Sequence, residues 1–159
     1  MSASNKSKMS VQVLKKFRVI YGSVRQHFRE IEQTCGITGS QLWLMQEVSK
    51  TPGIGVSDLA ERMSIHQSTC SQLVEKLVNR QFVLKERSKE DQRRVGLRLT
   101  AEAAKLIKKA PGPAEGVLPE ALSALPDDVI LALDSSLQRV IAQLQIKDDK
   151  LSEKPLSDL

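Results

Sequence analysis

The sequence is poor in aromatic residues and in cysteine, and it contains no long apolar run. Aromatic side chains make up 3% of its 159 residues, so aliphatic residues must fill the core, which is typical of packed helices. The two cysteines, Cys35 and Cys70, are too few for a disulfide framework. No stretch approaches the roughly 20 apolar residues of a spanning helix, and no apolar segment follows the first lysines. We therefore expect a cytoplasmic protein that has no membrane partner.

Residues that catalytic and metal sites require are also scarce. The two histidines, His27 and His66, lie in separate parts of the chain and lack the spacing of metal ligands. There is no glycine-rich phosphate loop, no G-x-S-x-G motif and no convincing pair of carboxylates. We therefore expect no enzymatic activity, no cofactor and no metal.

Positive charge is concentrated in the first two-thirds of the chain. The formal net charge is +5, but residues 1–31 hold seven Lys or Arg and one acidic residue, whereas residues 111–159 hold four and nine. Residues 57–100 hold nine and six. This asymmetry favours a polyanionic partner, and nucleic acid over a membrane surface, because no basic segment is also amphipathic and rich in tryptophan.

The chain length suits one domain with helical arms. Apolar residues spaced three and four apart predict a long amphipathic helix from about Ser10 to Gln33, ended by Gly36. Its stripe consists of Leu14, Phe17, Tyr21, Val24, Phe28 and Ile31. A capping box of Thr38 and Gln41 predicts a second helix from Gly39 to about Ser49.

Two short helices and a hairpin follow. Ser57 can cap a helix over 58–63, and after a brief turn residues 67–80 predict another helix, so the two form a helix-turn-helix. The period then changes to alternation in residues 82–87 and 95–99, which predicts a hairpin whose tip is charged.

The last third is again helical. Thr100 can cap a helix that extends to about Ala110, where Pro111-Gly112-Pro113 interrupts it. A short helical piece over about 115–122 and a helix from Asp127 to about Ile146 follow, and the charged tail 147–159 is expected to be mobile. Because a small domain cannot cover the apolar stripes of both the first and the last helix, we expect a partner subunit.

This order of elements resembles the multiple antibiotic resistance regulator (MarR) family of dimeric winged-helix transcription factors. The resemblance covers about 130 residues and rests on four stretches: VSDLAERM (56–63), QSTCSQLVEKL (67–77), EDQRR (90–94) and LRLT (97–100). The D-x-R of the wing and the following L-T are the most specific local part.

The resemblance implies a mainly α fold with a small β-hairpin wing, in which a winged helix-turn-helix core is flanked by N- and C-terminal dimerisation helices. The expected division is a dimerisation helix in 1–36, the DNA-binding region in 37–100, further dimerisation helices in 101–146 and the tail in 147–159. It implies a homodimeric, sequence-specific regulator, more often a repressor, that binds a pseudo-palindromic operator in double-stranded DNA.

The second helix of the pair carries the residues expected to contact bases. Gln67, Ser68, Thr69 and Gln72 supply donors and acceptors near its N-terminal end, on the face opposite Cys70 and the leucines. His66 stands where the family usually has a small N-cap residue, and it is either an exposed residue or a contact to DNA.

The hairpin tip is expected to contact the minor groove. Arg93 can enter this narrow, electronegative groove while Asp91 holds its guanidinium by a charge-assisted pair, which is also the role that the resemblance implies. Arg94 can instead meet a phosphate. Three further cations are candidates for phosphate contacts: Lys85, Arg87 and Lys89.

Members of the family bind small aromatic or anionic effectors between the dimer helices and the DNA-binding lobe. Candidates to line such a pocket are Tyr21, Phe28 and Trp43, with Arg25 and His27 as polar partners, although aromatic residues at helical spacing are more often part of the core. For Cys70 we favour a small buried hydrophobe over a sensor thiol, and we expect Cys35 to be more exposed.

Two alternatives remain beside a sequence-specific regulator. A winged helix used only for protein interaction predicts an apolar or acidic recognition helix and a neutral wing. In this sequence the corresponding helix is polar and the wing is basic. An architectural protein that binds DNA without sequence preference predicts contacts to phosphates alone.

Overall fold

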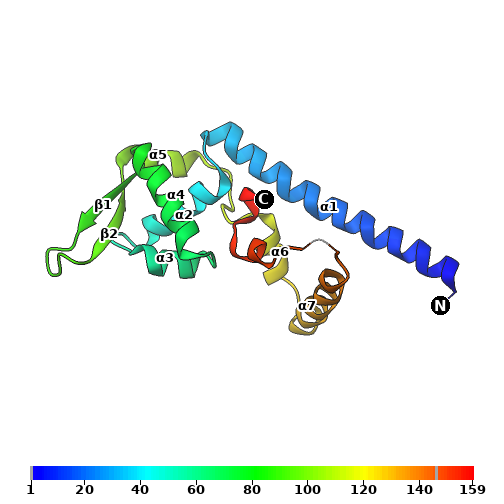
Figure 1. Cartoon of the computed structure of the whole chain (residues 1–159). Helices are drawn as coiled ribbons and strands as arrows, with labels where there is room; N and C mark the ends of the chain where they lie inside the picture. Colours follow the sequence, from blue (N-terminus) through cyan, green and yellow to red (C-terminus); the bar gives the residue numbers. More distant parts are fainter. Residues whose placement is uncertain (1, 146) are drawn as a thin grey trace.

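The computed structural model describes residues 2–145 and 147–159, and it is mainly helical with one two-stranded antiparallel sheet (Figure 1). This confirms the predicted fold class. The elements, in chain order, are α1 (Ala3–Cys35), α2 (Gly39–Lys50), α3 (Val56–Arg62), α4 (Gln67–Asn79), β1 (Val83–Arg87), β2 (Val95–Leu99), α5 (Ala101–Lys109), α6 (Val117–Ser123), α7 (Asp127–Ala142) and the 3-10 helices η1 (Asp149–Glu153) and η2 (Leu156–Asp158).

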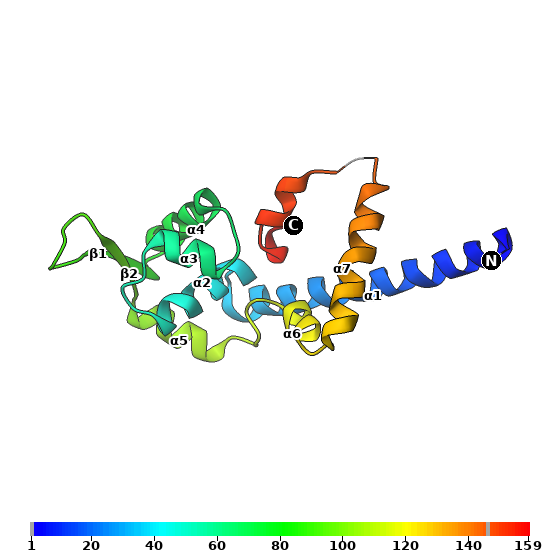
Figure 2. The same ribbon diagram turned by 90° about the horizontal axis from the view of Figure 1, so that it is seen from below.

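The molecule consists of a compact lobe and a long helical arm. Helices α2 to α5 and the hairpin form the lobe, from which the N-terminal half of α1 extends as a rod (Figure 1). The hairpin projects from the opposite end of the lobe, α6 lies beside α1, and α7 runs across the direction of the arm (Figure 2). The hairpin and the N-terminal part of the arm thus lie at opposite ends of the molecule (Figure 1).

Local capping explains where most helices begin. The capping box of Thr38 and Gln41 is present at the start of α2, and Thr100 caps α5, as predicted. Ser2 caps α1, which therefore begins seven residues before the predicted Ser10, because a capped start needs no apolar stripe. Ser57 does not cap α3: the N-cap residue is Gly55, and Ser57 lies within the first turn.

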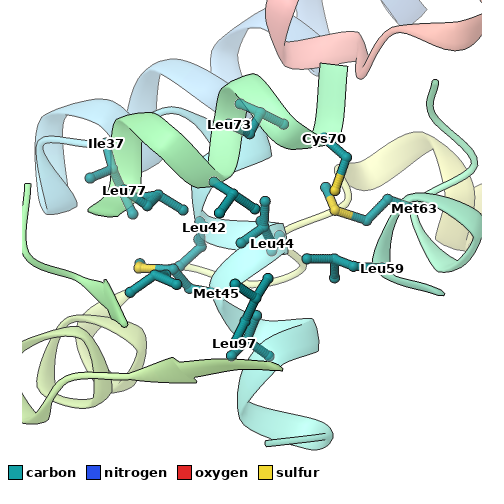
Figure 3. Packing of buried hydrophobic residues seen from close by; sticks show 14 of the residues in the cluster. Ile37, Leu42, Leu44, Met45, Leu59, Met63, Cys70, Leu73, Leu77 and Leu97 are labelled. Atoms are coloured by element: carbon teal, nitrogen blue, oxygen red, sulfur yellow. The ribbon is translucent and has the colours of Figure 1, made fainter. Parts of the chain in front are cut away.

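The core of the lobe is built around α2 (Figure 3). Leu42, Leu44, Met45 and Val48 of this helix are fully buried. They pack with apolar residues of the neighbouring elements, namely Leu59, Cys70, Leu73, Leu77 and Leu97. Burial of one such side chain contributes about 1.5–3 kcal/mol, so the helix-turn-helix and the hairpin share one rigid support.

The arm is packed only at its C-terminal end. Of the predicted stripe, Phe28 and Ile31 are buried, whereas Leu14, Phe17 and Tyr21 are 49%, 39% and 63% exposed. Most of the stripe is therefore left uncovered by the residues that the structure describes.

The C-terminal third differs in detail from the prediction. The Pro-Gly-Pro segment separates α5 from α6 as expected, and α7 ends at Ala142; Ile146, where we expected the end, lies outside the described residues. The segment 147–159, for which mobility was expected, carries η1 and η2, and its Pro155 is buried. None of the helices in the described part of the chain is long and apolar enough to cross a membrane.

Candidate nucleic-acid interface

Helix α4 presents its predicted contact residues on one outer surface. Its opposite face is held in the core by Cys70, Leu73, Val74 and Leu77, which are all buried. Burial of this face leaves the polar residues near the N-terminal end turned outwards: Gln67, Ser68, Ser71 and Gln72 are exposed, and Thr69 is half-buried. The helix therefore offers amide and hydroxyl groups where a major-groove contact requires them.

His66 is the N-cap residue of α4. Its Nδ1 accepts the backbone N–H of Ser68 at 3.1 Å and lies 2.7 Å from the Ser68 hydroxyl. The imidazole thus replaces the small side chain that usually caps this helix. Because Nδ1 is engaged, a contact from His66 to DNA would use Nε2.

The hairpin is fixed to the lobe by a third extended segment. Ile54 forms a bridge with Leu97, in which Gly53 donates to the Leu97 carbonyl at 2.8 Å and Leu97 donates to Ile54 at 2.9 Å. Gly96 lies so close to Gly53 that a Cβ on it would be 2.6 Å from the Gly53 oxygen. The wing consequently leaves the lobe at an angle set by backbone contact.

The wing tip is a tight turn organised by Ser88 and Asp91. The Ser88 hydroxyl accepts the N–H groups of Glu90 and Asp91, and Ser88 donates its own N–H to the Arg94 carbonyl at 2.9 Å. Asp91 accepts the backbone N–H of Arg93 at 3.0 Å. Both arginine side chains extend from this turn into solvent.

Residues 37–95, which contain the helix-turn-helix and most of the hairpin, match the model of the MarR family. The HTH-type transcriptional repressor MdtR of Bacillus subtilis is 21% identical over 137 residues, which are 86% of this chain and 88% of that protein.

The chain thus contains a MarR-family region over residues 37–95.

Solved structures share the MarR-family fold. A mutant of Escherichia coli MarR complexed with operator DNA is 18% identical with a TM-score of 0.54, covering 82% of this chain and 96% of that one. A complex of Staphylococcus aureus MepR with DNA is 20% identical with a TM-score of 0.54, covering 81% and 94%. At these identities the likeness establishes the fold.

One predicted contact in the MarR-type wing differs from the expectation. Asp91 was expected to hold the Arg93 guanidinium, but its carboxylate accepts the Arg93 backbone N–H and lies 3.9 Å from Nε of Arg94. Within the described residues, Arg93 takes part in no ion pair. The tight turn explains the difference, because a carboxylate two residues before a backbone N–H closes an Asx turn. Asp91 therefore shapes the tip.

The basic residues of the wing divide into paired and solvated groups. Lys85 forms an ion pair with Glu75 of α4, so this candidate for a phosphate contact already has a partner. Arg87 and Lys89 are exposed and, in the part of the chain that the structure covers, form no ion pair. They line a hollow between the wing and the start of α3, together with Arg94 and Arg98.

Arg98 is a basic residue of this surface that the sequence reasoning missed. It bonds Glu86 across the hairpin at 2.6 Å and is half exposed beside Arg87 and Arg94. The alternation of residues 95–99 contains the signal, because Arg98 lies between the inward Leu97 and Leu99 and must point outwards.

The five candidate effector residues do not converge. Tyr21 and Arg25 contact each other on the exposed surface of α1, where the guanidinium lies 5.6 Å from the ring centroid. His27 is buried and its Nε2 lies 2.7 Å from the Pro113 carbonyl, whereas Phe28 packs beneath Gly39 and Gly116. Trp43 is half-buried against the core. The hollows beside the wing, at the start of α3 and along the arm are lined by none of the five.

Both cysteines are buried. Burial raises the pKa of the Cys70 thiol to about 11, in agreement with its expected role as a small hydrophobe. Cys35 was expected to be more exposed but is 8% accessible, because it lies where α1 enters the core. Burial also raises the pKa of Cys35, while the nearby Lys109 opposes that change.

Proposed function

We propose that this MarR-family protein is a sequence-specific transcriptional repressor, without enzymatic activity, that binds a pseudo-palindromic operator as a homodimer. The observation that carries the proposal is the rigid connection of two recognition elements. The polar face of α4 and the basic wing both project from the core built on α2. A rigid support lets an adjacent major and minor groove be contacted in one binding event.

Base readout would come mainly from α4. Gln67 and Gln72 have the amide geometry for paired contacts to adenine, and Ser68 and Thr69 can donate or accept at either base pair. Arg93, at the exposed tip, would enter the flanking minor groove, where its charge meets the strongest negative potential.

Phosphate contacts would position the subunit without reading sequence. Arg87, Lys89 and Arg94 lie at the hollow beside the wing and are the accessible candidates, whereas Arg98, at the same hollow, would first have to leave Glu86. Lys85 would contribute only after leaving Glu75.

A second copy of the chain would cover the apolar part of the arm. Met9, Val13, Leu14 and Phe17 of α1 line an exposed hollow with Val140 of α7. The burial of such surface in a two-fold interface would bring two recognition helices to successive turns of the duplex, about 34 Å apart. The names of the relatives support this proposal: MdtR is described as a repressor, and the MarR and MepR structures contain DNA.

Release by a small aromatic or anionic effector stays a prediction. Such a molecule acts only if it binds more tightly to a spacing of recognition helices that does not fit the operator. Because the five candidate residues lie apart within one chain, a pocket would have to be completed by rearrangement or by the second copy.

The test is the selection of bound sequences from random duplex DNA, followed by challenge of the complex with aromatic acids. We expect an enriched inverted repeat with half-sites about one helical turn apart. Equal affinity for all duplexes at physiological salt would instead support an architectural protein, and no binding at all would support a protein-interaction module.

A further inference from the structure

The C-terminal segment 149–159 is docked between the arm and the helix-turn-helix. The Ser157 hydroxyl accepts the backbone N–H of Ser40 at 2.9 Å, and the Asp158 carboxylate accepts the Ser40 hydroxyl at 2.7 Å. Pro155 is buried beside these contacts. The segment thus adds a second set of caps to the start of α2, beyond the capping box that α2 already has.

The same segment reaches the recognition helix. The carbonyl of Glu153 accepts the backbone N–H of His66, the N-cap of α4, at 3.3 Å. In Figure 1 the last residues lie beside α2 in the space between the lobe and the arm. The end of α4 that must approach base edges is therefore in contact with the protein's own C-terminal segment.

The segment lies where DNA would approach the recognition helix. Its charges nearly balance, because Asp149, Glu153 and Asp158 stand against Lys150 and Lys154, so its position matters more than its charge. The backbone of Glu153 is bonded at the start of α4, and a duplex that approaches this end of the helix would meet the segment. Docking of the segment and seating of the helix in a groove consequently compete for one region.

The contacts that hold segment 149–159 are few enough for the segment to detach. They consist of one buried proline and a few hydrogen bonds, while the flanking Leu151 and Leu156 are 44% and 41% exposed. The core of the lobe does not depend on them, because its buried cluster is formed by residues up to Ala114.

We propose that residues 149–159 are an autoinhibitory strap, which holds the start of α4 away from DNA when docked and leaves when the duplex binds. The strap rests on the proposed function, since it regulates the same surface. If the docked form makes up about nine-tenths of the free protein, the apparent affinity for DNA is about tenfold below that of the released form.

The test uses the full chain and two matched double variants. Ser157→Ala with Asp158→Ala removes both contacts to Ser40. Ser152→Ala with Asp149→Ala changes the same residue types and the same charge in the same segment, but the Ser152 hydroxyl bonds only locally, to the Asp149 carbonyl. Affinities are measured by fluorescence anisotropy at one salt concentration, with a duplex selected from random sequences and with an unselected duplex.

We expect the first double variant to bind about tenfold more tightly than the wild type and the control to be unchanged. Equal affinities for the two variants would overturn the strap. If the selected and unselected duplexes bind equally, the proposed sequence-specific function is wrong. Comparison of the two variants on the unselected duplex still tests the strap in that case, because any duplex must reach the start of α4.

A measurement on the wild type alone keeps the proposal testable if a variant folds poorly. Hydrogen exchange is followed at the amides of Ser40 and His66, which the segment protects. The strap predicts faster exchange at both amides when DNA is bound, opposite to the usual protection at an interface. Slower or unchanged exchange in the complex would overturn it.

Discussion

Gly96→Ala is expected to destabilise the wing. A Cβ at this position would lie 2.6 Å from the Gly53 oxygen and 2.9 Å from its Cα, whereas ordinary contacts begin at 3.4 Å. The obstructing atoms are backbone, so the strands must move apart, and the hydrogen bonds between Gly53, Ile54 and Leu97 weaken. Forcing one methyl group into a packed contact of this kind costs about 1–3 kcal/mol.

Gly55→Ala is the matched control for this perturbation. It lies on the same side of the wing, but a Cβ there would be 3.9 Å from its nearest neighbour, the Val95 carbonyl, which is ordinary contact. Its φ of −80° suits alanine, and it provides no side-chain cap that could be lost. We expect a change below about 1 kcal/mol, the usual scale of an N-cap substitution.

The assay is urea unfolding at a fixed protein concentration, combined with DNA affinity. Gly96→Ala should lower the free energy of unfolding by about 1–3 kcal/mol, which is a fall in Tm of about 2–4 °C for each kcal/mol in a chain of this size. Binding of a selected duplex should weaken several-fold, since the tip is displaced. Equal stability of the Gly96→Ala and Gly55→Ala proteins would refute the reasoning, because the close backbone approach would then not constrain the wing.

The remaining predictions concern DNA contact, assembly, capping and thiol chemistry. Arg93→Ala should weaken DNA binding by about 1–3 kcal/mol and relax selection at the flanking A·T positions; an unchanged Kd at matched salt contradicts a minor-groove contact. Phe17→Asp should convert the proposed dimer to monomer in analytical ultracentrifugation, since this 39% exposed ring lines the apolar hollow of the arm; a persisting dimer places the interface elsewhere. Thr38→Ala should lower the free energy of unfolding by about 0.5–2 kcal/mol, measured by thermal unfolding, because it removes the capping box; an unchanged free energy would mean that other caps suffice. Alkylation of Cys70 should be slow in the folded protein at pH 8 and accelerate as the pH rises towards about 11, because burial raises the pKa of this thiol and only the thiolate reacts; rapid labelling at pH 8 would show that the site opens.

The periodicity and the caps of the sequence were sufficient for the local structure. The capping box at the start of α2, the cap of α5, the buried face of α4 and the two strands of the hairpin follow from short-range rules, and the structure confirms them. These features are decided within a few residues by hydrogen bonding and side-chain period, so no knowledge of distant contacts is needed. The outward position of Arg98 also follows from a short-range rule, the alternation of residues 95–99.

Other features required the assembled chain. The pairing of Asp91 with the Arg93 backbone depends on the closure of the tip, and the engagement of Lys85 depends on where α4 places Glu75. The burial of Cys35 depends on how α1 enters the lobe, and the exposure of Tyr21 depends on how far the arm extends beyond it. None of these follows from spacing along the chain.

The amino-acid sequence determined the helices, the wing and the polar face that it presents, because each is specified by residues close to one another in the chain. Tertiary structure alone decided that Gly96 meets Gly53, that the arm stays uncovered and that Ser157 and Asp158 return to Ser40. These contacts join residues up to 118 positions apart, and they form only when the packed core has fixed the directions of the elements that carry them.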